Sequence, residues 1–266
     1  MSSGPNSVPP LRDPQELAAE LGPASDWLLV LDFDGTLAPI VDHPDLATPA
    51  DGALEIVTEL AGRTQVAVVS GRPIDDVRRR LGGLAVAYAG GHGAELVLAD
   101  GSPAPLLDPA TVTATLDQVE SEISALVDDE PGWLVERKQA SVAVHHRLAA
   151  PDSVSDHLPR IQALLERLAT SPPGFEVLAG KAVLELRPAG IDKGAALTRI
   201  AEATDARPPL VVGDDVTDED AFLVARARGG RGVLVAEEER ASAAADRLTD
   251  PDAVVRLLSA LARTGS

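Results

Sequence analysis

Residues 27–40 read WLLVLDFDGTLAPI, and this stretch decides the fold class. Its first five residues are apolar, and Asp32, Asp34 and Gly35 come close behind them. A short apolar run that ends in acidic residues and glycine is typical of a buried parallel strand that leads into a loop. Open α/β sheets bind their ligands at the carboxyl ends of such strands. We therefore expect a site here, where one carboxylate could attack a substrate while the other moves a proton.

Strands and helices alternate on both sides of this stretch. QVAVVS at 65–70 predicts a second strand, and helical patterns flank it at 50–62 and 73–83. The Val-rich segment PLVVGDD at 209–215 predicts another strand of the same kind, between two further helices. This order indicates an α/β core.

The chain is predicted to have an inserted domain and a flexible N-terminal segment. From 109 to 187 the pattern changes to a helix, a strand pair, a second helix and a second strand pair. The core is therefore expected in two parts, residues 26–108 and 188–266, on either side of this insert. Residues 1–25 are predicted to be a flexible N-terminal segment, because the first fourteen are rich in Ser, Gly and Pro.

Two more polar motifs occur where a strand meets a helix. Ser70, Gly71 and Arg72 follow an apolar strand, and the free N–H groups of the next helix could receive phosphate oxygens. Lys193 begins a predicted helix, so its ammonium group would lie near the same edge of the sheet and could pair with carboxylates and a phosphate. Taken alone, each of these motifs is more common as an ordinary turn or a solvated side chain.

Residues 213–220, GDDVTDED, carry five acidic residues in seven positions after the Val-rich strand. Such carboxylates would repel one another unless a cation lies among them. Acidic residues are also favoured at the amino end of a helix. Both explanations apply: Asp218 to Asp220 are expected partly to cap the next helix, and Asp214 is expected to face a metal ion. The pattern leaves the parts played by Asp215 and Asp218 open.

The composition limits the classes of function. The 266-residue chain has a formal net charge of -19, which disfavours nucleic acid and anionic membranes as partners. It has no cysteine, so a metal site must use oxygen or histidine ligands. No apolar stretch approaches the ~20 residues of a membrane span, and the first residues lack the pattern of a signal peptide. We expect a cytoplasmic protein.

Together, the aspartate pair, the serine, the lysine and the acidic cluster occur in the chain order of the haloacid dehalogenase-like phosphatases, which the chain resembles. The resemblance implies an α/β fold with a Rossmann-like core, a parallel sheet flanked by helices, and the insert as a smaller α/β cap domain. It implies Asp32 as the nucleophile, Asp34 as the general acid and base, and Ser70 and Lys193 as phosphate-binding groups. It further implies Mg²⁺ as the cofactor, held by Asp32, the backbone carbonyl of Asp34 and Asp214.

A narrower resemblance covers most of the chain from Trp27 onward. The segments LDFDGTLAPI, VVSGR, GGHGAEL, VERK, VLELRPAGIDKG and VGDDVTDEDAF are similar to those of trehalose-6-phosphate phosphatases. The resemblance implies that the cap grips the distal glucose through charged side chains. The residues expected to bind the substrate are Gly71, Arg72, His92, Glu136, Lys138, Arg147 and Glu185. From strand alternation alone, the charges at 136 and 138 are at least as compatible with a solvent-exposed face.

The histidines are less informative. His92 lies between glycines and is compatible with a loop residue, a core residue or a substrate contact, so its role stays open. His145 and His146 are adjacent on a predicted strand and should face opposite ways, which excludes a paired metal site. We interpret this pair as structural.

The resemblance therefore implies Mg²⁺-dependent hydrolysis of trehalose 6-phosphate to trehalose and phosphate through a phospho-aspartate. The expected partner is a small sugar phosphate, with functional coupling to a trehalose-6-phosphate synthase, and we expect a monomer. One alternative is a phosphatase of the same fold that acts on another sugar phosphate or small phosphate ester. Its catalytic residues would be the same, so only the cap residues distinguish this alternative from a trehalose-6-phosphate phosphatase. Another is a non-catalytic receiver-like binding module, against which the insert of ~80 residues argues.

Overall fold

The computed structural model describes residues 7–41, 43–138, 140–170, 174–180, 182–204 and 207–264. The chain divides into two compact units. Residues 1–106 and 192–266 form unit 1, and residues 107–191 form unit 2. The boundaries inferred from the sequence for the insert, 109 and 187, lie a few residues inside those of unit 2. Each unit has its own sheet and its own hydrophobic core.

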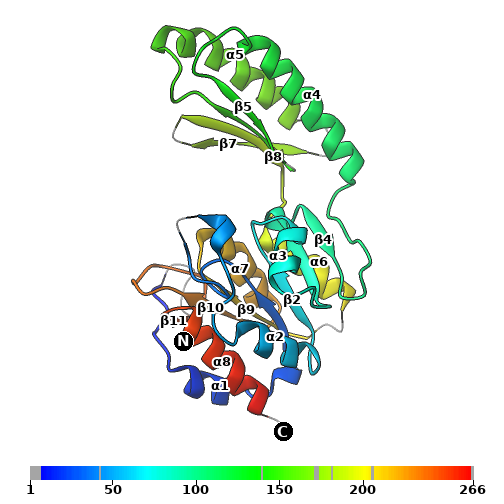
Figure 1. The fold of residues 1–266 in the computed structure, drawn as a ribbon, viewed down its shortest axis with the longest axis vertical. Coiled ribbons are helices and arrows are strands. Elements are labelled where there is room, and N and C mark those ends of the chain that lie inside the picture. Colours follow the sequence, from blue (N-terminus) through cyan, green and yellow to red (C-terminus); the bar gives the residue numbers. More distant parts are fainter. Residues whose placement is uncertain are drawn as a thin grey trace. The chain divides into compact units, whose positions relative to one another are not determined.

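Unit 1 is built on a seven-stranded sheet in the order β11-β10-β9-β1-β2-β3-β4 (Figure 1). Neighbouring strands run parallel except β3 and β4, which pair antiparallel. β1 (Leu28–Leu31) is buried along its whole length and pairs with β2 and β9. The other strands are β2 (Val66–Val69), β3 (Ala87–Gly90), β4 (Glu95–Val97), β9 (Pro209–Gly213), β10 (Arg231–Val235) and β11 (Asp246–Leu248). The predicted α/β class with a parallel sheet is confirmed.

Helices cover both faces of this sheet because the side chains of β1 alternate between two cores. Leu29 and Leu31 pack into one core, and Leu28 and Val30 pack into the other. The helices of the first core are α1 (Pro14–Leu21), α2 (Ala53–Ala61), α3 (Ile74–Arg80) and α8 (Pro251–Arg263), and those of the second are α6 (Lys193–Ala203) and α7 (Glu219–Ala227). Short 3₁₀ helices are η1 (Ala24–Asp26), η2 (Pro44–Leu46), η3 (Gly91–Gly93) and η4 (Val216–Asp218).

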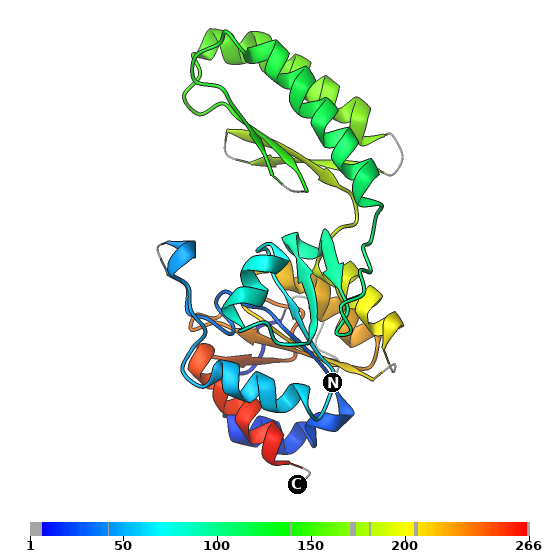
Figure 2. The same cartoon turned by 45° about the vertical axis from the view of Figure 1, so that its right-hand side comes forward.

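The N-terminal segment differs from the flexible stretch expected over residues 1–25. Residues 1–6 lie outside the described residues, but Pro14–Leu21 forms α1, which packs against α8 (Figure 2). Asp13 caps this helix by accepting hydrogen bonds from N–H groups of its first turn, and Leu17 is completely buried. A helix this short is stabilised mainly by tertiary packing. Its partner lies at the other end of the chain, so local composition does not reveal it.

Unit 2 combines a four-stranded antiparallel sheet with two long helices. The strand order is β5-β6-β8-β7, and the apolar side chains of the sheet pack with those of the helices into one core. The elements are α4 (Pro109–Val127), β5 (Leu134–Arg137), β6 (Val142–His145), α5 (Pro151–Ala169), β7 (Phe175–Gly180) and β8 (Val183–Pro188). In the part of the chain that the structure describes, no helix has both the length and the apolar character needed to cross a membrane.

Candidate active site

Polar side chains follow three neighbouring strands of unit 1 at their carboxyl ends. Asp32 follows β1, Ser70 follows β2, and Asp214 follows β9. Because these strands are parallel neighbours, their carboxyl ends meet at one edge of the sheet. Lys193, the first residue of α6, brings its side chain to the same edge.

A buried ammonium group joins two carboxylates at this edge. Lys193 Nζ lies 3.0 Å from Asp32 Oδ1 and 2.7 Å from Asp218 Oδ1. The side chains of the lysine and the two aspartates are 3%, 6% and 3% exposed, so the charges interact with little screening by water. Burial opposes the ammonium charge, but Asp32 and Asp218 outweigh it and raise the pKa of Lys193. The lysine therefore remains a cation inside the protein.

Asp218 is a member of this group that the sequence pattern did not identify. One of its oxygens accepts a hydrogen bond from the Asp215 N–H at 3.0 Å, as part of a capping box at η4. Its side chain makes no capping hydrogen bond to α7, contrary to the capping role expected of it. Its other oxygen accepts from Lys193. A Cβ atom at Gly213 would overlap the Asp218 carboxylate, so the glycine leaves room for this inward orientation. The acidic run alone does not show which of its members faces the lysine.

Three carboxylates in this group could hold a metal ion. Asp32, Asp214 and Asp218 each have an oxygen within 4.8 Å of the others. Burial raises the pKa of Asp32 well above its usual value; Lys193 opposes this rise, and the other two carboxylates add to it. Burial also raises the pKa of Asp214 to about 6. A cation bound by these oxygens would offset both the desolvation of the carboxylates and their mutual repulsion. The three carboxylates are therefore a suitable ligand set for a metal ion.

Gly35 allows the loop after β1 to pass close to Asp214. The φ angle of Gly35 is 73°, a region that other residues rarely adopt, and a Cβ atom there would overlap the Asp214 carboxylate. The glycine in DGT is therefore required both by the backbone conformation and by the close approach of two loops.

Asp34 is held by an arginine instead of the buried lysine. Arg72 Nε donates to Asp34 Oδ2 at 2.6 Å, and Arg72 Nη2 donates to Asp34 Oδ1 at 2.7 Å. The same guanidinium donates to Asp76 at 2.9 Å and lies 5.6 Å from the centre of the Phe33 ring. A forked pair of this kind fixes the orientation of a carboxylate. Arg72, predicted to bind substrate, therefore contacts the residue predicted to move protons.

His92 lies against Gly71 at the end of β2. A Cβ atom at Gly71 would lie 2.6 Å from His92 Cε1, so only glycine fits there without a shift. The His92 N–H donates to the Ser70 carbonyl at 3.0 Å, and the residue has a left-handed φ of 58°. Ser70 is buried, and its Oγ accepts from the Arg72 N–H at 3.2 Å. These backbone contacts hold the predicted residues 70–72 and His92 together.

One cavity of unit 1, about 690 Å³ in volume, includes every core residue that the sequence predicts for the site. These residues are Asp32, Asp34, Ser70, Gly71, Arg72, His92, Lys193 and Asp214. The cavity also exposes apolar side chains from the loop after β1, such as Ile40. A lysine, an arginine and a histidine beside a carboxylate cluster suit an anionic substrate bound together with a cation.

Three predicted sugar-binding residues meet on the sheet of unit 2. Lys138 Nζ lies 3.4 Å from Glu185 Oε1 and 4.0 Å from Glu136 Oε2. Glu136 in β5 and Glu185 in β8 both pair in register with Ala143 of β6, so they lie on one face. All three side chains are at least 28% exposed, which leaves them accessible to a ligand.

His145 joins this group, whereas Arg147 does not. His145 Nε2 lies 3.0 Å from Glu136 Oε2, a contact that the structural interpretation of the histidine pair overlooks. His146 lies elsewhere, with its ring 5.6 Å from that of Trp133. Arg147 is exposed in the turn after β6 and forms no hydrogen bond or ion pair within the described residues. The contact of His145 depends on strand pairing, which the sequence pattern alone did not fix.

Solved structures of known proteins share this architecture. A trehalose-6-phosphate phosphatase from Aspergillus fumigatus matches with a TM-score of 0.77 and 27% identity, over 97% of this chain and 100% of that chain. A haloacid dehalogenase-like hydrolase from B. subtilis matches with a TM-score of 0.53 and 16% identity, over 87% of this chain and 98% of that chain. The fold is therefore that of the haloacid dehalogenase-like hydrolases, as the sequence predicts.

Sequence comparison narrows this class to one family. The model of the trehalose-phosphatase family matches residues 30–252, and the chain belongs to this family. A Mycolicibacterium paratuberculosis protein named trehalose-phosphate phosphatase is 40% identical over 231 residues, which is 83% of this chain and 58% of that protein. A Mycobacterium tuberculosis protein named an uncharacterized glycosyl hydrolase is 42% identical over 246 residues, 87% of this chain and 18% of that protein. The chain therefore spans only part of the length of these relatives.

Proposed function

We propose that the chain hydrolyses trehalose 6-phosphate to trehalose and phosphate, with Mg²⁺ as cofactor and a phospho-aspartate intermediate at Asp32. The observation that carries this proposal is the buried group of Asp32, Lys193 and Asp218 with Asp214 beside it. A carboxylate that attacks a phosphate needs nearby positive charge to offset the repulsion between two anions. Membership of the trehalose-phosphatase family supports the choice of substrate.

The proposed reaction has two steps. First, an oxygen of Asp32 attacks the phosphorus while the bond from phosphorus to the sugar oxygen breaks, and Asp34 gives a proton to that oxygen. Second, a water molecule attacks the phosphorus, Asp34 takes its proton, and the bond to Asp32 breaks to release phosphate. Ser70 and Lys193 hold the phosphoryl oxygens throughout. Asp34 can exchange protons only when part of its forked pair with Arg72 opens.

The residues around Asp32 fit Mg²⁺. Asp32 and Asp214 offer carboxylate oxygens and Asp34 offers its backbone carbonyl, and Mg²⁺ prefers oxygen ligands. Both oxygens of Asp218 are engaged, one by Lys193 and the other by the Asp215 N–H, so we assign Asp218 to positioning the lysine. When bound, Mg²⁺ would neutralise charge on the phosphoryl group as a Lewis acid.

The direct test is phosphate release from a panel of esters with and without Mg²⁺. The panel contains trehalose 6-phosphate, glucose 6-phosphate, sucrose 6-phosphate and phosphoglycolate. We expect release that requires Mg²⁺ and is fastest from trehalose 6-phosphate. Faster release from another ester would retain the reaction and contradict the substrate. No release from any ester would overturn the proposal and favour a binding function.

We expect Glu136→Ala to lower kcat/KM for trehalose 6-phosphate by about tenfold to a hundredfold, because its carboxylate would accept hydrogen bonds from sugar hydroxyls. Hydrolysis of p-nitrophenyl phosphate, which has no sugar, should be unchanged. The measurement is kcat/KM for both substrates. Glu176→Ala is the matched control, since Glu176 is a half-buried glutamate of the same sheet and pairs with Arg187 outside the cluster. Equal losses on both substrates, or equal losses in both variants, would contradict the sugar-binding role.

Other expectations stay predictions. The role of Arg147 in sugar binding, coupling to a synthase, the monomeric state and the cytoplasmic location all follow from the sequence reading. The proposed reaction requires none of them.

A further inference from the structure

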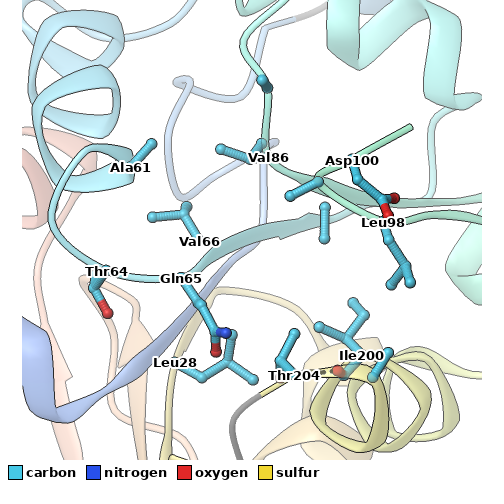
Figure 3. A pocket seen from close by; sticks show the side chains of 14 residues that line it. Leu28, Ala61, Thr64, Gln65, Val66, Val86, Leu98, Asp100, Ile200 and Thr204 are labelled. Carbon is cyan, nitrogen blue, oxygen red and sulfur yellow. Dashed lines mark hydrogen bonds between the residues drawn. The ribbon is translucent and has the colours of Figure 1, made fainter. Parts of the chain in front are cut away.

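A second cavity of unit 1 lies at the amino-terminal ends of the parallel strands, whereas the candidate active site lies at their carboxyl ends. It has a volume of about 340 Å³, which is within the range of sites that bind small organic molecules. Leu28, Val66 and Ala87 line it, and these are the first residues of β1, β2 and β3. Figure 3 shows the lining, with Leu28 and Val66 labelled. The catalytic carboxylates follow the other ends of the parallel strands, so this cavity is distinct from the candidate active site.

The lining is mainly aliphatic and contains no basic side chain among the described residues. Its acidic residue, Asp100, is exposed to solvent. A phosphate ester would therefore find no counter-charge in this cavity. Ala85, Ala99 and Ala203 are exposed at the cavity, so small side chains leave its apolar interior open to a ligand. The lining chemistry favours a mainly apolar, uncharged molecule.

Gln65 gives the cavity a buried acceptor atom, Oε1, for which the described residues supply no donor. Neither lining threonine supplies a donor, because the Thr64 hydroxyl donates to the Trp27 carbonyl and the Thr204 hydroxyl donates to the Ile200 carbonyl. The second of these bonds is drawn in Figure 3. A buried acceptor without a donor is costly and calls for an explanation.

We propose that this cavity binds a small, mainly apolar, uncharged organic molecule that donates one hydrogen bond to Gln65 Oε1. The aliphatic walls would bury the ligand, and the buried acceptor of Gln65 would fix its orientation. The site is separate from the proposed phosphatase reaction and does not depend on it.

Indole and benzofuran form a matched pair of probes, because they have nearly the same shape and only indole has an N–H donor. Each would be titrated into the ¹⁵N-labelled full chain and followed by amide NMR shifts. We expect saturable binding of indole with shifts at Val66, Ala87 and Ile200. Benzofuran should bind about threefold to tenfold more weakly, the range expected for loss of one net hydrogen bond.

Two substitutions test the location. Ala203→Leu should fill the cavity and weaken indole binding at least about tenfold. Ala227→Leu is its matched control, since Ala227 is also an exposed alanine at the last position of a helix and does not line the cavity. Gln65→Leu should remove the preference of indole over benzofuran.

Several results would overturn the proposal. They are the absence of saturable indole binding, shifts that map away from this cavity, and equal binding by the Ala203 and Ala227 variants. A preference for indole that survives in Gln65→Leu would overturn the assigned hydrogen bond. Absence of binding would mean that water alone satisfies Gln65. Because none of these readouts is activity, their failure is separate from failure of the proposed reaction.

Discussion

The Asp32→Asn variant is expected to keep its fold but to release phosphate from trehalose 6-phosphate at least about a thousandfold more slowly than the wild type. The amide has nearly the shape of the carboxylate but does not attack phosphorus. The substitution removes one of three crowded carboxylates, and Lys193 keeps its contact with Asp218, so we expect no loss of thermal stability. The measurements are single-turnover phosphate release and thermal unfolding.

A second measurement on this variant tests the covalent step. Acid quenching of the wild-type reaction should leave one phosphoryl group on the peptide that contains Asp32, detectable by mass spectrometry, and the variant should show none. Asp51→Asn serves as a control for the substitution itself, because Asp51 is exposed and outside the site. Turnover of Asp32→Asn within tenfold of wild type would remove Asp32 as the nucleophile.

Lys193→Met should be damaging to both folding and catalysis. It removes the cation that Asp32 and Asp218 share, and leaves buried carboxylates uncompensated. Breaking a buried ion pair by removing one partner costs about 3–5 kcal/mol of unfolding free energy. Loss of a charge that stabilises the transition state should also lower kcat by about a hundredfold or more. Urea unfolding without Mg²⁺ measures the first effect, and steady-state rates measure the second.

The double variant Lys193→Met with Asp218→Asn separates the two effects. Neutralising Asp218 removes one of the uncompensated charges, so part of the lost stability should return while activity stays low. A cycle with both single variants gives the coupling between the two residues. If Lys193→Met unfolds at the same urea concentration as wild type, the buried charge contributes nothing to stability and this account of the site is wrong.

Much of the architecture could be predicted because the signal is local. The strands before Asp32 and Asp214 are short runs rich in Val or Leu, and each is followed directly by an acidic residue. Both aspartates lie at the carboxyl ends of their strands. The chain order of the motifs led to the correct class and family. The fold follows from patterns that a few consecutive residues carry.

The missed features depend on residues that are distant in sequence. Asp218 faces Lys193 because the short 3₁₀ helix η4 lies between β9 and α7. From the sequence alone, the acidic residues within 214–220 are equally compatible with capping α7. Arg72 pairs with Asp34 because the two residues follow neighbouring strands, β2 and β1. His145 contacts Glu136 because β5 and β6 pair in the sheet of unit 2. Helix α1 has a suitable cap and apolar residues, but its partner α8 comes from the other end of the chain. Such contacts are decided by packing.

The division of the chain at 106/107 and 191/192 bears on how such a protein could change over evolution. Asp32 and Lys193 belong to unit 1, and Glu136 and Glu185 belong to unit 2, which has a core of its own. Substitutions that remodel one unit need not disturb the packing of the other. Under the proposed function, a lineage could therefore exchange or diversify residues 107–191 to accept other phosphorylated compounds, while the proposed reaction in unit 1 is inherited unchanged.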